Sequence, residues 1–429
     1  MPSPGLPTVA ESNLSSSRQT LIGFRSDTLS LLDHIHPAHA LSSGIKAVVV
    51  EDNNNMLPLT TDDFVFDALS AGDLYRYSRT CKEAHYAVSS YFRRKKNFDL
   101  HKVLERYFPP EEVFKFRKLQ ATTGMIISGS TALQFLDRTE YPESDLDLYV
   151  DHRYRRPIAW WLKDIGYNLL PPLNHRNPRL SFQQIVDLVP DYQTFHFSDC
   201  NTYPAPRKGY FGAASVLTFE MNYPYRKVQL ITCYHTPLEL ILNFHSTCVM
   251  NVITHEKAYS LYPRATFDQR RALSYIPPAT ELNDTEARKI AQLKYVSRGW
   301  QIVDQITDDE FRDPGSVFAP GERHLGDSKC WTLPILPKLE LPESNIEANS
   351  WSLLYRGNLE PWMIFAVFRS WNLRFIYLIS DEDLDQYVFR MKLQGGNADE
   401  RDNDAYFKRM IEEYRKEDDS RASHNTTPK

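Results

Sequence analysis

The sequence predicts an α+β protein in which a small helical module precedes a mixed sheet with flanking helices. Residues 57–92 carry apolar side chains at helical spacing. Residues 124–150 and 216–233 instead hold short apolar or alternating runs bounded by turn residues, a pattern typical of strands. Residues 263–395 add a helical stretch near 285–306 and aromatic-rich runs. We therefore expect a third, C-terminal region of helical or mixed structure.

Length and composition limit the classes of protein that fit. The chain has 429 residues, enough for two or three domains, and 42% are apolar, enough for a sizeable core. Its 24 Tyr and 23 Phe argue against wholesale disorder. A net charge of −5 does not indicate a nucleic-acid binder, which is usually basic. No apolar run reaches the length of a membrane span, so no membrane association is expected.

The cysteines and the two ends of the chain indicate an intracellular protein. Five widely scattered cysteines, an odd number, are typical of reduced thiols, and we expect a cytoplasmic and/or nuclear location. The polar N-terminus does not resemble a signal peptide, and residues 1–50 are expected to be a largely flexible extension. A histidine cluster there lacks the cysteines or carboxylates that would complete a metal site. Residues 396–429 are expected to form a charged tail.

The helical module is expected to cover residues 57–107. Apolar residues between positions 65 and 81 fit two short amphipathic helices joined by Ser70-Ala71-Gly72, with Asp73 at the start of the second. A third helix is predicted from Glu83 to Phe92. Three such short helices cannot bury much surface alone, so they should pack on a partner or on the next domain.

The segment Leu57–Phe92 resembles an F-box. The likeness rests on the Leu57-Pro58 start, on Leu69 and Leu74, and on a run that contains Arg76, Arg79, Cys81 and Lys82. The hydrophobic pair usual after Leu-Pro is replaced here by Thr60-Thr61-Asp62-Asp63. The resemblance implies a Skp1-type adaptor as partner and a role as adaptor of a ubiquitin ligase. The alternative is a helical hairpin packed inside the protein.

The most informative pattern lies in residues 120–262. A short strand, Gly124–Ile127, runs into Ser128-Gly129-Ser130 and a helix over 131–136, and a second strand covers Leu146–Val150. Side chains alternate along a strand, so Asp145 and Asp147 point to one face and repel each other unless a cation lies between them. Mg²⁺ is bound in this way by carboxylates and phosphates. The glycine turn at a helix start offers N–H groups to a phosphate.

Further elements are predicted downstream. A helix that contains Trp160 and Leu162 ends at Gly166. A hairpin joins 216–221 to 227–233 through Asn222-Tyr223-Pro224-Tyr225, and Pro237 opens a helix of roughly 20 residues over 238–259.

This order of elements, from Ile126 to Ile231, resembles the nucleotidyltransferase superfamily with its polymerase-β-like fold. The resemblance implies that Gly129 and Ser130 hold the triphosphate of an NTP. It also implies that Asp145 and Asp147 are catalytic and bind Mg²⁺, with a third acid on the later strand. That position holds Gln229 here, and an amide neither accepts a proton as a base nor adds charge. Glu220, on the preceding strand, is an acid out of order.

The sequence therefore favours an F-box-like adaptor whose degenerate nucleotidyltransferase-type domain binds a nucleotide or a protein target. The alternative is an active Mg²⁺-dependent enzyme that moves an NMP from an NTP to a hydroxyl acceptor. A structural domain without ligand is a third reading, in which Asp145 caps a turn and Asp147 pairs with Arg153 or Arg155. Zinc-ligand residue types also occur downstream, although buried structural thiols and histidines with satisfied hydrogen bonds are favoured there: Cys233, His235, His245 and Cys248.

Overall fold

The computed structural model describes residues 61–95, 98–171, 180–190, 213–276, 282–368 and 375–380. Contacts divide the chain at residues 50/51, and every described residue belongs to the second unit. The predictions for residues 1–50, for Leu57-Pro58 and for the 396–429 tail lie outside the described residues. In the part of the chain that is described, no helix is long and apolar enough to cross a membrane.

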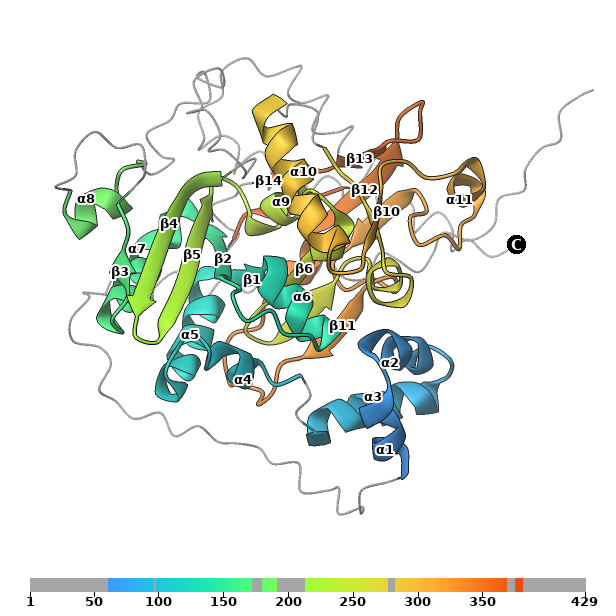
Figure 1. The fold of residues 1–429 in the computed structure, drawn as a ribbon, viewed down its shortest axis with the longest axis horizontal. Coiled ribbons are helices and arrows are strands. Elements are labelled where there is room, and N and C mark those ends of the chain that lie inside the picture. Colours follow the sequence, from blue (N-terminus) through green and yellow to red (C-terminus); the bar gives the residue numbers. More distant parts are fainter. Residues whose placement is uncertain are drawn as a thin grey trace, which may run out of the picture. The chain divides into compact units, whose positions relative to one another are not determined.

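The centre of the fold is an eight-stranded mixed sheet with the order β11-β7-β6-β1-β2-β5-β4-β3 (Figure 1). The β2–β5 pair is parallel, and the other neighbouring pairs in this sheet are antiparallel. The predicted α+β class with a mixed sheet is thus confirmed. The strands are β1 Ile126–Ser128, β2 Leu146–Asp151, β3 Asn168–Leu169, β4 Ala213–Asn222, β5 Tyr225–Cys233, β6 Asn251–Ile253, β7 Lys257–Ser260 and β11 Trp331–Pro334.

The sheet contains strands from both sides of the domain boundary predicted at 262/263, because β11 pairs with β7 along its whole length. Shorter sheets accompany it: β10-β12-β13, β14-β15 and β8-β9. Their strands are β8 Arg271–Leu273, β9 Gln301–Val303, β10 Gly321–His324, β12 Ser350–Tyr355, β13 Pro361–Ile364, β14 Ala366–Phe368 and β15 Tyr377–Ile379.

Helices form the N-terminal module and flank the sheet. The predicted helices over 131–136 and around Trp160 are present as α6 and α7, and the predicted stretch near 285–306 is helical up to Val296. The described α-helices are α1 Thr61–Ala68, α2 Ala71–Ser78, α3 Lys82–Lys95, α4 Leu100–Leu104, α5 Pro110–Thr123, α6 Gly129–Asp137, α7 Arg155–Asp164, α8 Phe182–Val186, α9 Pro237–Leu242, α10 Leu282–Val296 and α11 Asp308–Arg312.

The long helix predicted over 238–259 is wrong. Pro237 does open a helix, but α9 ends at Leu242, and the chain continues through a 3₁₀ turn into β6 and β7. β6 pairs with β1 through Ile253 and Ile127. The backbone groups of β1 would be buried without partners on that side, so strand pairing prevails over local helical spacing.

The three-helix module packs on the sheet region through α2. Ser70 caps this helix, Asp73 lies in its first turn, and the ring of Tyr75 lies 5.3 Å from that of Trp331 on β11. Gly72 meets the backbone of Phe267 so closely that an added Cβ would lie 2.3 Å from its carbonyl oxygen. One face of the module is therefore buried against the body of the protein.

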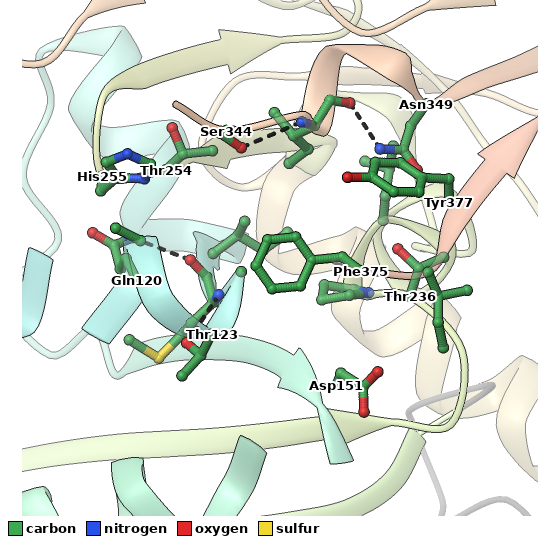
Figure 2. Close-up of a pocket in the computed structure, with 18 of the residues that line it drawn as sticks. Gln120, Thr123, Asp151, Thr236, Thr254, His255, Ser344, Asn349, Phe375 and Tyr377 are labelled. Atoms are coloured by element: carbon green, nitrogen blue, oxygen red, sulfur yellow. Dashed lines mark hydrogen bonds between the residues drawn. The ribbon is translucent and has the colours of Figure 1, made fainter. Parts of the chain in front are cut away.

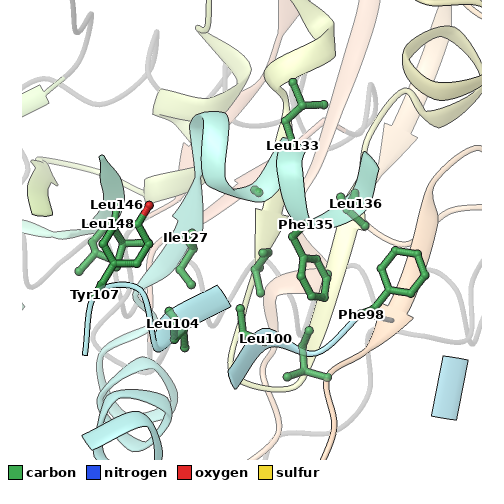
Figure 3. Packing of buried hydrophobic residues seen from close by; sticks show 14 of the residues in the cluster. Phe98, Leu100, Leu104, Tyr107, Ile127, Leu133, Phe135, Leu136, Leu146 and Leu148 are labelled. Atoms are coloured by element: carbon green, nitrogen blue, oxygen red, sulfur yellow. The ribbon is translucent and has the colours of Figure 1, made fainter. Parts of the chain in front are cut away.

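A continuous apolar core connects the module, the strands and α6 (Figure 3). This core includes Ile127 of β1, Leu148 of β2, and Leu133 and Leu136 of α6, and all four side chains are fully buried. Segments before β1 complete this layer with Phe98, Leu100, Leu104 and Tyr107. This packing holds the start of α6 in a defined position against the edge of β2.

Candidate functional site

The structure brings the glycine turn and the second aspartate into direct contact. Gly129 opens α6 with φ 66°, in the left-handed region, and β1 pairs Ser128 with Asp147. A Cβ on Gly129 would lie 2.6 Å from Oδ2 of Asp147. Ser130 follows, nine-tenths buried, and its hydroxyl makes no hydrogen bond to another described residue. The predicted juxtaposition of Gly129 and Ser130 with Asp147 is present.

Asp145 is engaged by a lysine. Its Oδ2 lies 2.7 Å from Nζ of Lys227 on β5 and accepts a longer hydrogen bond of 3.4 Å from the Gln229 amide. The parallel register of β2 and β5 places Gln229 beside Asp147. Gly129, Ser130, Asp145, Asp147 and Lys227 are called the acidic site below.

The alternative roles considered for the aspartates do not hold. Arg153 pairs with Asp151 at 2.7 Å and Arg155 with Asp187 at 3.1 Å, so neither is the partner of Asp147. The Asp145 side chain forms an ion pair instead of capping a turn.

Glu220 does not lie beside Gln229, the position that the resemblance assigns to a third acid. It lies opposite Lys227 in the β4–β5 ladder, whereas Thr218 lies opposite Gln229. Its carboxylate accepts a 3.1 Å hydrogen bond from the Tyr225 hydroxyl.

Asp145 and Asp147 differ in their charged partners. Burial, and after it the nearby charge of Asp145, raises the pKa of Asp147 to about 7 against the opposing charges of Lys294 and Lys227. Burial alone would lower the pKa of Lys227, but its hydrogen bond to Asp145 raises it overall. Asp145 therefore has a firmly protonated partner, and Asp147 makes no hydrogen bond or ion pair through its carboxylate with another described residue.

Lys294 of α10 lies near the acidic site, and Arg298 follows it in the turn after that helix; no sequence pattern indicated either residue. Lys294 interacts electrostatically with both Asp145 and Asp147, and burial lowers its pKa. Arg298 stacks on the ring of Tyr141, 3.6 Å from its centroid. Its Nη1 is buried without a hydrogen-bond partner among the described residues. Both residues lie far along the chain from the glycine turn and belong to no motif.

The donor set does not fit a two-metal centre. Within the described ranges, no group of three or more His, Cys, Asp or Glu residues is placed to hold a metal ion. Mg²⁺ demands near-octahedral oxygen coordination. The acidic site offers it one carboxylate already bound to an ammonium group, the half-buried carboxylate of Asp147 and the neutral amide of Gln229.

The zinc-ligand residue types are likewise occupied elsewhere. His235 bonds to Glu239 at 3.0 Å, and His245 bonds to the Ser246 hydroxyl at 2.7 Å. Cys233 and Cys248 are buried free thiols, and burial raises the pKa of Cys248 to about 12. The two thiols are thus buried, as the sequence favoured, and both histidines are partly buried and hydrogen-bonded within the protein.

A separate small pocket lies at the other end of β2 (Figure 2). Asp151, Thr236, His255 and Phe375 are among its lining residues, and its volume of about 40 Å³ has room for only two or three waters. Asp151 lies four residues beyond Asp147 on the same strand, about 13 Å away. The pocket is therefore too small for a nucleotide and distinct from the acidic site.

Comparisons with known protein families, with curated proteins and with solved structures found no match to this chain. What the acidic site does must therefore be inferred from its own residues.

Proposed function

We propose that this protein is an F-box-like adaptor whose nucleotidyltransferase-type domain binds a nucleotide at the acidic site without turning it over. The observation that carries the proposal is the Lys227–Asp145 ion pair, with Gln229 beside Asp147 in the strand register. Nucleotidyl transfer needs a base for the attacking hydroxyl and cations for the leaving pyrophosphate. The β5 positions that face the two aspartates supply an ammonium and an amide instead.

Binding does not require that chemistry. The first turn of α6 presents backbone N–H groups and the positive end of a nine-residue helix, which attract phosphate. Lys227 and Lys294 add positive charge beside them. A polyphosphate placed there would meet these donors and only one carboxylate that lacks an ion pair.

The module supports the adaptor half of the proposal. Its inner face is buried, but Phe64 and Val65 of α1 are 71% and 53% exposed, and Tyr86 of α3 is 67% exposed. Contiguous exposed apolar side chains mark interaction surfaces, and Phe64 and Val65 are neighbours on α1. We assign this surface to a Skp1-type adaptor.

The nucleotide half is tested by calorimetric titration of the purified protein with each NTP, with Mg²⁺ and with EDTA. We expect saturable binding at one site and no release of pyrophosphate. Failure of every NTP to bind under both conditions would refute it. Pyrophosphate release that is abolished in an Asp145→Ala/Asp147→Ala variant would instead establish the active enzyme.

The adaptor half is tested by co-purification with a Skp1-type protein. A Phe64→Asp/Val65→Asp variant should lose at least tenfold in affinity, because it places charge on the docking surface. Phe311→Asp, at another partly exposed apolar residue on α11, is the matched control and should bind normally. Equal binding by both variants, or no binding by the unmodified protein, would contradict the assignment.

A further inference from the structure

The acidic site carries its own cation. The Lys227 ammonium lies 2.7 Å from Asp145 Oδ2, and the two side chains are only 26% and 32% exposed. Such a half-buried pair is screened by solvent less than a surface pair. The ammonium therefore stands beside the two carboxylates, where a cation would relieve their repulsion.

The strand register accounts for this placement. Asp147 lies beside Gln229 and Leu146 beside Val228, so Lys227 comes level with Asp145 at the start of β2. Lys227 and Gln229 share one face of β5 because side chains alternate along a strand. A divalent ion at this place would have to displace the ammonium from Asp145, and Gln229 would offer it no charge in return.

We propose that Lys227 takes the place of a divalent cation, so that the acidic site binds a phosphate-bearing nucleotide without a metal ion. An ammonium group has three donors, so it can hold Asp145 and still donate to a phosphate oxygen. Lys294 supplies a second positive charge near both aspartates. The choice of a nucleotide as the ligand rests on the proposed function. The exclusion of a metal ion, in contrast, is a property of the protein without nucleotide.

The test measures Mn²⁺ binding by electron paramagnetic resonance, without nucleotide. The unmodified protein should bind Mn²⁺ only weakly. Lys227→Gln/Gln229→Asp, which frees Asp145 and adds a third carboxylate, should bind it at least tenfold more tightly. Lys227→Arg keeps the charge and should resemble the unmodified protein.

Lys257→Gln is the matched control, because it also removes a lysine from an ion pair, the 2.8 Å contact with Glu347. It should leave Mn²⁺ affinity unchanged. Circular dichroism confirms that each variant is folded. The inference is overturned if the unmodified protein binds Mn²⁺ as tightly as the double variant, or if the folded double variant gains no affinity.

A second arm needs no variant. Nucleotide affinity of the unmodified protein should agree within about twofold between EDTA and Mg²⁺, and binding that disappears in EDTA would also overturn the inference. If no nucleotide binds under either condition, the proposed function fails, and the Mn²⁺ measurements still decide whether Lys227 excludes a metal.

Discussion

Gly129→Ala is expected to be the most informative single substitution in the acidic site. The residue has φ 66°, and a Cβ there would lie 2.6 Å from Oδ2 of Asp147. Two costs follow from these facts. An alanine in the left-handed region costs about 1–2 kcal/mol, and turning the end of the Asp147 side chain away from its rotamer to make room costs about 0.5–1.5 kcal/mol. The free energy of unfolding should therefore fall by about 1.5–3.5 kcal/mol.

The structure provides a control for the backbone cost. Gly299 also has a positive φ, 96°, but a Cβ there would meet no atom within 4 Å. Gly299→Ala should therefore lower the free energy of unfolding by only about 1–2 kcal/mol. The excess cost of Gly129→Ala over this control measures the contact with Asp147.

Urea unfolding of a double-mutant cycle between Gly129→Ala and Asp147→Ala tests the reasoning. Asp147→Ala removes the carboxylate, so Gly129→Ala should then cost only the backbone contribution, with a coupling energy of about 0.5–1.5 kcal/mol. A coupling below about 0.5 kcal/mol, with Gly129→Ala no worse than Gly299→Ala, would refute the close approach of the glycine turn and the aspartate.

Two further predictions concern the module and the titration of the site. Trp331→Ala should lower the free energy of unfolding by about 3–5 kcal/mol and increase proteolysis within α1–α3. The reason is that the buried Trp331 ring contacts the rings of Tyr75, Phe92 and Phe98 in the module region. The control is Trp362→Ala, at a 38% exposed position, and equal urea midpoints for the two variants would contradict this prediction. The pKa of Asp147 is about 7 in the native state, above its value in the unfolded state, so the native state binds one more proton at lower pH. This proton binding stabilises the native state, and the stabilisation is lost as the pH rises through 7. Asp147→Asn lacks this loss and should become more stable relative to the unmodified protein between pH 5 and 8 in urea unfolding. A stability difference that does not change over this range would show that the aspartate is ionised throughout it.

Local patterns were enough to predict much of the fold. The β1–α6–β2 segment and the β4–β5 hairpin follow from apolar runs bounded by Gly, Pro and Asn, because turns and strand alternation depend on neighbouring residues. The same spacing identified Gly129, Ser130, Asp145 and Asp147 as one candidate site. Local spacing predicted a helix over residues 238–259, but part of this segment forms strands because β6 pairs with β1.

The sequence by itself was therefore enough to predict that Gly129, Ser130, Asp145 and Asp147 meet at one site, and that the neighbouring strand carries the neutral Gln229. Only the tertiary structure decided the charge balance of that site. Lys227 meets Asp145 across 82 residues because β5 pairs parallel to β2 in one register, and a shift by one residue would turn the lysine to the other face. Lys294 belongs to α10, which lies far along the chain from the two aspartates. Long-range pairing of this kind leaves no mark in local spacing, because it depends on how distant segments share one buried core.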